Sequence, residues 1–350
     1  MNSFKLPIFL KINENATNNL IFKLEKEFSN IRDKKVIFFT SKKIYSLFKN
    51  KINRFVKNHD KLTVFYVDNS SYDIAVKVAK KISIEDYEYI IGFGGGKILD
   101  TAKYSSYVSK KTFISIPTTL SNDGLASPIA VLKTKEGKAK SFGCKSPDGI
   151  IIDTNIIKNT PKRLLIAGIG DTLSNYSALF DWKLDCRTNN NKANDFAYLL
   201  SETALNMLLF SKESDIHSKN FIKELAQSLV LSGLAMEIAG NSRPCSGSEH
   251  LFSHSLDEHH DLAISHGLQV ALGSVVSCIL QDRDKKILID FLNKYEVNIS
   301  PKALGISKDV FIESWLKAQE TRPDRYTILN EIKLDKNILE EIYINIMEVL

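Results

Sequence analysis

The chain has 350 residues, and its 47 Lys and Arg exceed its 41 Asp and Glu, giving a formal net charge of +6. A hydrophobic fraction of 43% is ordinary for a globular protein and excludes disorder of the whole chain. No stretch approaches the roughly 20 consecutive apolar residues of a membrane-spanning helix, so no membrane span is expected. The positive charges are interleaved with acidic ones, which disfavours nucleic-acid binding, whereas the slight excess of positive charge suits small anionic substrates.

The amino terminus and the cysteines bear on the cellular compartment. The sequence MNSFKLPIFLKINENATNNL lacks the cationic start, apolar run and small-residue cleavage site of a secretory signal. The cysteines contain no CxxC pair, and a chain of this size needs no disulfide. We therefore expect a cytoplasmic protein with reduced thiols at Cys144, Cys186, Cys245 and Cys278.

The first 158 residues alternate short β-rich runs with longer helical patterns. The runs are almost continuously apolar, as expected of parallel strands that are buried on both faces. Between them lie helical patterns such as 71–81 and 97–108. Because strand–helix–strand alternation indicates βαβ units, we predict a Rossmann-like parallel-sheet domain over 1–158. The predicted strands are 36–39, 62–67, 89–93, 113–116 and 150–152.

From residue 159 onward the pattern changes to long segments with helical periodicity and few strand candidates. At about 150 residues per domain, the length of the chain already suggests two domains. The second half therefore predicts an all-α domain over 159–350. Its clearest helical segments are 163–186, 193–211, 219–240, 265–281 and 336–349.

A glycine-rich segment, GFGGGKILDTAK, covers Gly92 to Lys103 and follows the strand at 89–93 directly. It matches neither GxGxxG nor the GxxxxGK loop that ends in Ser or Thr. Even so, three consecutive glycines let backbone N–H groups approach a phosphate closely, and the start of a helix adds partial positive charge. The position at the carboxyl end of a strand favours phosphate binding over a tight turn without a ligand.

A second polar segment, PTTLSNDGLASP, runs from Pro117 to Pro128 and also follows a strand directly. It gathers hydroxyls, an amide and one carboxylate at the same edge of the sheet. Composition alone leaves a ligand-binding loop and a solvated loop equally open.

The histidines are clustered, because five of the seven fall between His250 and His266. His250 and His254 are four residues apart, so on a helix they share one face. Such clustering is typical of a metal site. A further ligand must come from elsewhere, and Asp171, which follows a glycine break and opens a helical segment, is the candidate. Taken alone, it would be interpreted as a helix N-cap. Two histidines and one carboxylate with an open position describe a catalytic metal site.

Together these motifs resemble the sn-glycerol-1-phosphate dehydrogenase family, in the superfamily of iron-type alcohol dehydrogenases, glycerol dehydrogenase and dehydroquinate synthase. The resemblance runs from about residue 36 to the segment 322–327, and it implies a dehydroquinate synthase-like fold. The glycine-rich segment alone indicates the superfamily, whereas SNDGLASP with SRPCSGSEH is much more specific and resembles the glycerol-1-phosphate branch. The matching segments are GFGGGKILDTAK, PTTLSNDGLASP, GIGDTLSNYSA, SRPCSGSEHLFSH and SHGLQV.

The resemblance assigns roles to individual residues. Asp171, His250 and His266 match the metal ligands, and Asp171 is also close to the substrate. His254 matches a histidine that faces the substrate, and Asp123 matches a substrate-binding carboxylate. Asp171, His254 and Asp123 are therefore the expected catalytic residues. The expected cofactor contacts are Gly94, Gly95, Gly96, Lys97, Ile98, Thr118, Thr119, Leu120, Ser121 and Ser127.

The implied activity is a metal-dependent interconversion of dihydroxyacetone phosphate and sn-glycerol 1-phosphate with NAD(P)H. One alternative is a related glycerol or polyol dehydrogenase that acts on an unphosphorylated or different small polyol. Another is a cyclase of the dehydroquinate synthase type, but those enzymes generally have Glu where this chain has Asp171. A nucleotide-binding module without chemistry is disfavoured, because every implied ligand and substrate residue is present.

The sequence also bears on the cofactors and the partners of the protein. The residues Thr40-Ser41-Lys42-Lys43 lack the acidic side chain that binds the adenosine ribose of NAD, so NAD(H) and NADP(H) are both expected. One divalent metal is expected, Zn2+ first, although two imidazoles and a carboxylate also accept Ni2+ or Fe2+. The expected partners are a small phosphorylated triose and further copies of the chain in a homo-oligomer. The segment Arg322 to Thr327 is interpreted as holding a structural Arg–Asp pair, and no basic residue is identified for the substrate phosphate.

Overall fold

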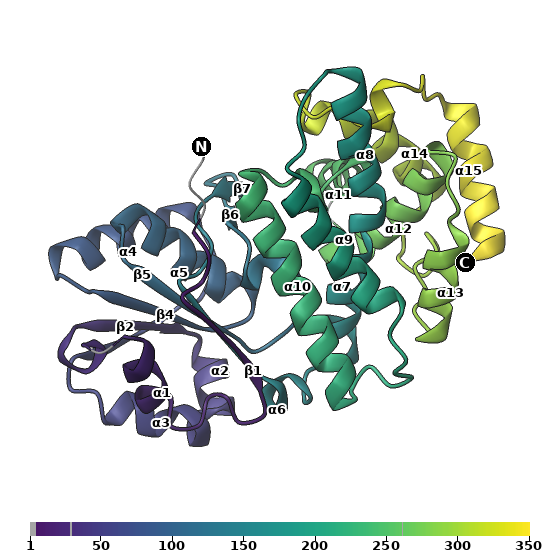
Figure 1. Ribbon diagram of the computed structural model, residues 1–350. Helices are drawn as coiled ribbons and strands as arrows, with labels where there is room; N and C mark the ends of the chain where they lie inside the picture. The colour runs from purple at the N-terminus through teal and green to yellow at the C-terminus, as the bar shows by residue number, and fades with distance from the viewer. Residues whose placement is uncertain (1–4, 29, 261) are drawn as a thin grey trace. The chain divides into compact units, whose positions relative to one another are not determined.

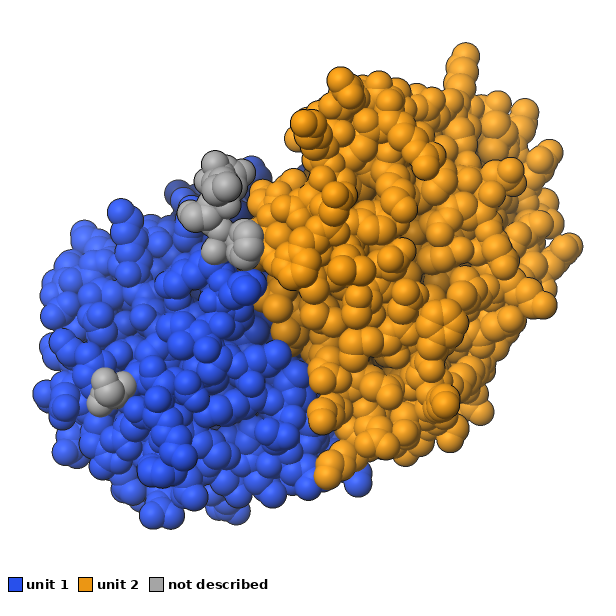
Figure 2. Space-filling view, viewed as in Figure 1, with its two compact units in different colours: residues 1–161 blue, residues 162–350 orange. Residues whose placement is uncertain are grey.

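The computed structural model describes residues 5–28, 30–260 and 262–350. The chain divides into two compact units, residues 1–161 and 162–350 (Figure 2). Among the described helices, none is both long enough and apolar enough to cross a membrane.

The first unit contains a parallel sheet, as the sequence predicts. Within the described residues the sheet has six strands in the order β1-β8-β5-β4-β2-β3 (Figure 1). The five predicted strands are confirmed as β2, β3, β4, β5 and β8, and every pairing between neighbours is parallel. The bounds are β1 Phe9–Asn13, β2 Val36–Thr40, β3 Leu62–Tyr66, β4 Tyr89–Gly94, β5 Thr112–Pro117 and β8 Gly149–Asp153.

Helices cover both faces of this sheet, which explains the continuously apolar strands. Phe38 and Ile91 belong to a buried cluster that includes side chains of α1 and α3. Their neighbours Ile37 and Ile90 belong to another cluster, shared with α4 and α5. Successive residues of a strand point to opposite faces, so both sets must be apolar. The helices are α1 Leu20–Glu27, α2 Lys42–Leu47, α3 Lys49–Lys57, α4 Tyr72–Ile84, α5 Gly96–Ser109 and α6 Thr154–Ile157.

Two features of this unit lie outside the sequence prediction. In the edge strand β1, the buried Phe9 and Ile12 stand among partly or fully exposed residues, so its pattern is mixed. An antiparallel hairpin, β6 Ile129–Lys133 and β7 Ala139–Gly143, follows the short 3-10 helix η2 Asp123–Leu125. The sequence does not predict the hairpin because Lys140 and other exposed polar residues interrupt the apolar pattern of a strand.

The second unit is helical throughout its described residues, as predicted. The segment 163–186 forms two helices rather than one, and α11, α13 and α14 are not among the predicted helical segments. The helices are α7 Lys162–Leu173, α8 Asn175–Thr188, α9 Asp195–Leu209, α10 Lys219–Ala239, α11 Ser248–His259, α12 His266–Leu280, α13 Lys286–Lys294, α14 Lys308–Lys317 and α15 Lys336–Val349. Short 3-10 helices are η3 Arg243–Cys245, η4 Ala318–Thr321 and η5 Ile328–Asn330.

A buried carboxylate at the end of β8 holds the amino-terminal segment against the sheet. Asp153 Oδ2 accepts hydrogen bonds from the Thr17 hydroxyl at 2.6 Å and the Thr17 backbone N–H at 3.1 Å. Lys51 lies 3.4 Å from the same oxygen. Burial by itself raises the pKa of Asp153, but the Thr17 hydrogen bonds and Lys51 outweigh it and leave the pKa lowered.

We predict that Asp153→Asn lowers the free energy of unfolding by about 2 kcal/mol, because hydrogen bonds to a charged acceptor are lost. The loss is full above pH ~4, the pKa of an unfolded aspartate. It fades as the pH falls through the lower pKa of the folded state, where the wild-type carboxylate is also protonated. Urea unfolding at neutral and acidic pH measures the difference. Asp60→Asn, at an exposed aspartate, is the control; an equal effect of both substitutions would contradict the prediction.

Candidate functional site

Two glycines bring α7 and α12 into backbone contact. A Cβ placed on Gly170 would lie 2.0 Å from the Gly267 carbonyl oxygen, and one on Gly267 would lie 1.8 Å from the Ala167 carbonyl oxygen. Only glycine fits such an approach. Asp171 follows the first glycine and His266 precedes the second, so the helix crossing places these two side chains together.

The predicted position of Asp171 needs correction. The sequence indicates a glycine break before a new helix, but α7 continues through Gly168 and Gly170 and carries Asp171 in its last turn. The glycines therefore serve helix–helix contact rather than a chain break.

A third side chain comes from α11, which starts at Ser248 and carries His250. One ligand atom from each of Asp171, His250 and His266 lies within 4.8 Å of the others. His266 Nε2 is 3.8 Å from Asp171 Oδ1, and the two imidazole rings are 5.0 Å apart at their centroids. Two imidazoles and one carboxylate at this spacing could hold a divalent metal and leave a coordination position open.

Hydrogen bonds orient both imidazoles. His250 Nδ1 donates to Glu249 Oε1 at 2.8 Å. Ser253 gives its own proton to Gln269 Oε1 at 2.5 Å, so its oxygen is free to accept from His266 Nδ1 at 3.0 Å. With both Nδ1 atoms engaged, each Nε2 offers its lone pair. A carboxylate or hydroxyl behind each ligand is the usual outer shell of a metal-binding histidine.

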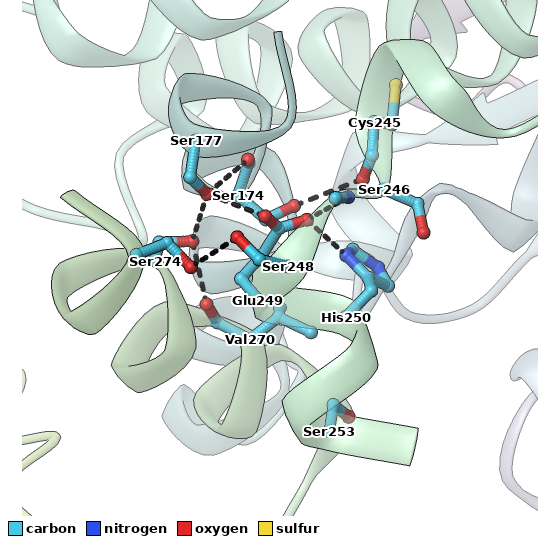
Figure 3. Close-up of polar contacts among 12 residues, drawn as sticks. Ser174, Ser177, Cys245, Ser246, Ser248, Glu249, His250, Ser253, Val270 and Ser274 are labelled. Atoms are coloured by element: carbon cyan, nitrogen blue, oxygen red, sulfur yellow. Dashed lines mark hydrogen bonds and ion pairs between the residues drawn. The ribbon is translucent and has the colours of Figure 1, made fainter. Parts of the chain in front are cut away.

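Glu249 is itself fixed in a polar interior. The Gly247 N–H donates to it at 2.6 Å and the Ser177 hydroxyl of α8 at 2.8 Å. Figure 3 shows this carboxylate between Ser177 and Ser274 on one side and His250 on the other. Burial raises the pKa of Glu249 to about 7. Residues of α8, α11 and α12 therefore act together, through Glu249, to orient the imidazole of His250.

The electrostatics keep the histidines neutral. Burial, reinforced by the charges of Arg325 and Arg322, lowers the pKa of His250 to about 3. Burial and the neighbouring His250 lower the pKa of His266 to about 4. The lowered pKa values mean that the imidazoles do not have to lose a proton before they bind a cation at neutral pH.

His254 lies one helical turn beyond His250 on α11, as the spacing predicts, and the two ring centroids are 6.3 Å apart. It does not belong to the three-residue metal cluster. Burial, followed by the charge of Arg322, holds the pKa of His254 well below its ordinary value. His254 is thus a neutral imidazole beside the cluster, able to donate or accept one hydrogen bond.

The sequence indicates that an Arg–Asp pair holds the segment 322–327, but the hydrogen bonds of the structure are different. Arg325 donates to the Ser246 carbonyl at 2.5 Å and to the Ser242 hydroxyl at 2.8 Å. Arg243 donates to the Tyr326 carbonyl at 2.6 Å. These bonds fasten the segment beside the start of α11, and η4 just before it packs against the same helix.

Motifs in the sequence do not reveal Glu249 and Ser253, which orient the imidazoles, or Arg322, whose charge acts on His250 and His254. Glu249 carried one available signal, since an acid directly before a candidate ligand is well placed to support it. The hydroxyl of Ser253 and the charge of Arg322 are recognised only from their spatial neighbours.

The glycine-rich segment of the first unit forms the turn from β4 into α5. Gly95 is the N-cap of α5, whose first backbone N–H groups have no partners within the helix. The Thr118 N–H donates to the Gly94 carbonyl at 2.9 Å. Thr119 Oγ1 lies 3.4 Å from the Cβ position of Gly95. The two predicted cofactor segments therefore lie side by side at the carboxyl end of the sheet.

The side chains of the predicted cofactor residues differ in burial and in hydrogen bonding. The buried Thr118 hydroxyl has no hydrogen-bond partner among the described residues, as expected of a group that awaits a ligand. Ile98 belongs to a buried apolar cluster, and Leu120 is buried too. Ser127 is buried and donates its backbone N–H to the Asp123 carbonyl at 2.9 Å. The exposed polar surface therefore comes mainly from Lys97, which is exposed, and from the half-buried Gly95, Gly96, Thr119 and Ser121.

Comparison with known proteins connects the chain to one group of enzymes. Residues 15–161 match the family model described as iron-containing alcohol dehydrogenase. A glycerol-1-phosphate dehydrogenase (NAD(P)+) of Methanobrevibacter smithii is 36% identical over 315 residues, which cover 89% of each chain. Its counterpart in Methanothermobacter thermautotrophicus is 37% identical over 282 residues, covering 79% of this chain and 81% of the other.

Solved structures share the fold. Glycerol dehydrogenase from Schizosaccharomyces pombe matches with a TM-score of 0.79 and 22% identity, covering 100% of this chain and 91% of the other. At this identity the likeness concerns the fold alone. It agrees with the predicted dehydroquinate synthase-like arrangement of a parallel-sheet unit followed by a helical unit.

We predict that Gly267→Ala greatly weakens divalent-metal binding. A methyl group 1.8 Å from the Ala167 carbonyl must separate α7 from α12 and move His266 away from Asp171. Zinc content after loading and dialysis measures the effect, and circular dichroism shows whether the helices remain. Gly143→Ala is the control, because a Cβ there meets nothing within 4 Å. Full zinc content in Gly267→Ala would contradict the role of the helix crossing.

Proposed function

Because this chain belongs to the glycerol-1-phosphate dehydrogenase family, we propose that it interconverts dihydroxyacetone phosphate and sn-glycerol 1-phosphate. In the reductive direction, hydride from NAD(P)H reaches C2 of the ketone and a proton reaches its oxygen, giving the alcohol and NAD(P)+. The observation that carries this proposal is the preformed cluster of Asp171, His250 and His266 in a chain so similar to these enzymes.

The three residues of the cluster are the proposed ligands of one divalent metal. Their fit rests on two neutral imidazoles with engaged Nδ1 atoms and a carboxylate within reach of both. When bound, the metal supplies Lewis-acid polarisation of the substrate oxygen. Zn2+ is the proposed ion, and Ni2+ or Fe2+ suit the same donor set.

The remaining residues of the proposed site orient the substrate. His254 is neutral and offers a hydrogen bond to a substrate hydroxyl beside the metal ligands. Asp123 offers a carboxylate for another hydroxyl, and either residue can begin a proton relay to solvent. Asp171 contributes to both metal and substrate binding in this proposal.

The proposed cofactor site is the turn from β4 into α5, with Gly94 to Ile98 around the pyrophosphate. Thr118, Thr119, Leu120, Ser121 and Ser127 line it. We propose that NAD(H) and NADP(H) are both accepted. After β2, Ser41 caps α2 through the Ile44 N–H at 3.2 Å, and the next residues, Lys42 and Lys43, are exposed and available to a 2′-phosphate.

The proposed setting is a cytoplasmic homo-oligomer. The cysteines Cys144, Cys186, Cys245 and Cys278 are all free, which suits a reducing compartment. The family likeness is the support for the oligomer.

The direct test is the loss of nicotinamide absorbance with zinc-loaded protein. Dihydroxyacetone phosphate and dihydroxyacetone are offered in parallel, each with NADH and with NADPH. We expect turnover of the phosphorylated ketone with both cofactors, and loss of bound metal and activity in His266→Ala. His259→Ala, at an exposed histidine of α11, is the control and retains both.

Other outcomes reassign the chain. Turnover of the unphosphorylated ketone alone would indicate a glycerol or polyol dehydrogenase. Cofactor binding without any net consumption would indicate a cyclase. Full activity and metal content in His266→Ala would overturn the ligand assignment.

Arg322 is the cation that we propose for the substrate phosphate. Its side chain is half-buried, and no hydrogen bond or ion pair joins its guanidinium to another described residue. Its charge contributes to the lowered pKa values of both His250 and His254, so it acts on the proposed substrate site. The charge of Asp324 acts on Arg322 without a hydrogen bond or ion pair between them, so the forked donors of the guanidinium are available to a phosphate.

We predict that Arg322→Met raises the KM for dihydroxyacetone phosphate about tenfold to a hundredfold, the value of a lost charge-assisted hydrogen bond. Competitive inhibition by inorganic phosphate weakens in parallel, and zinc content stays unchanged. Arg322→Lys is intermediate, because it keeps the charge but not the forked donor geometry. Arg187→Met, at an exposed arginine, is the control. An unchanged KM in Arg322→Met would place the phosphate elsewhere.

A further inference from the structure

Lys103 is a charged side chain in the interior of the first unit. It lies about two helical turns into α5 and is only 1% exposed. Its ammonium donates to the Gly124 carbonyl and to the Ile129 carbonyl, both at 2.6 Å. Its nitrogen is also 3.5 Å from Asp100 Oδ1. Two hydrogen bonds and one ion pair thus compensate for the burial of this charge, which is otherwise costly.

The two carbonyls lie at the two ends of the segment that carries Asp123. Gly124 follows this aspartate directly, and Ile129 begins β6. Within the segment, the N–H groups of Ala126 and Ser127 donate to the Asp123 carbonyl at 2.8 and 2.9 Å. The segment is thus a tight turn, and Lys103 fastens both of its ends to α5.

Charge adds to this anchoring. Asp100 and Asp123 are near each other, and burial raises the pKa of each to about 6. The charge of Lys103 lowers both values, whereas Asp100 raises that of Asp123. Cys144, whose thiol has its pKa raised by burial to about 12, is a further titratable group close to Lys103 and Asp100. Lys103 is therefore the cation that favours the ionised form of Asp123.

We propose that Lys103 is a positioning residue, which holds the Asp123 segment against α5 and so fixes the Asp123 carboxylate where the substrate binds. The same helix begins at the glycine turn of the proposed cofactor site. Lys103 therefore makes one rigid body of the cofactor turn and the substrate carboxylate. The catalytic part of this inference rests on the proposed function, whereas the anchoring does not.

The alternative is that Lys103 merely fills space in the core. Lys103→Met distinguishes the positioning role from the space-filling role, because methionine matches the volume of the lysine side chain without its charge or its donors. We expect folded protein that binds NADPH as tightly as the wild type, with the KM for dihydroxyacetone phosphate raised at least tenfold. The acid limb of the kcat/KM profile moves to higher pH, because Asp123 has lost its cation.

Lys103→Arg keeps the charge but changes the donor geometry. We expect the acid limb to return to the wild-type position, with a KM between those of the wild type and Lys103→Met. If Lys103→Met does not fold, Lys103→Arg decides, and a wild-type KM there would overturn the proposal. Lys80→Met, at an exposed lysine of α4, is the control. A folded Lys103→Met with wild-type KM and pH profile, differing only in thermal stability, would establish the space-filling role instead.

Amide hydrogen exchange without substrate tests the anchoring independently of activity. In Lys103→Met, residues 123–129 are expected to exchange at least tenfold faster, while α11 and α12 keep their protection. Unchanged exchange in 123–129 would overturn the anchoring. Wild-type protein that fails to reduce dihydroxyacetone phosphate while this exchange difference is present would reject the proposed function and leave the anchoring in place.

Discussion

The contact of α7 with α12 at Gly170 and Gly267 is the constraint on which the candidate metal centre depends. Any side chain at either glycine would separate two backbones that nearly touch. Backbone packing places the adjacent residues, Asp171 and His266, so that Oδ1 of the first and Nε2 of the second are 3.8 Å apart. This placement does not depend on the binding energy of a metal. A site built at a helix crossing is rigid because main chains cannot yield as surface side chains do.

The polar interior around this crossing complements the backbone contact. Glu249 and Ser253 orient the two imidazoles, and they are themselves held by Ser177 and Gln269. Burying so many polar groups contributes little net stability, because each bond replaces one with water. The hydrogen bonds instead fix the directions of donors and acceptors, as a metal site requires and an apolar core does not.

In the first unit, a parallel sheet brings the candidate cofactor residues together. Parallel strands end at one edge, so the glycine turn after β4 and the polar segment after β5 become neighbours although they are separate in sequence. Hydrogen bonding of Thr118 to Gly94 joins them, and Lys103 adds a second link from α5 to the Asp123 turn. The candidate side chains of the first unit thus lie in turns fastened to regular elements, whereas those of the second unit lie on α7, α11 and α12.

Local patterns in the sequence were sufficient for five of the six described strands of the parallel sheet, the helical second half, the glycine turn and the shared helix face of His250 and His254. These features depend on periodicities of two or 3.6 residues and on glycine at a turn, which a short window reveals. Only the tertiary structure placed Asp171 in the last turn of α7, gave Glu249 its role and directed Lys103 to two carbonyls. These facts depend on contacts between segments far apart in the chain, and a glycine that permits a helix crossing has the same sequence signature as one that ends a helix.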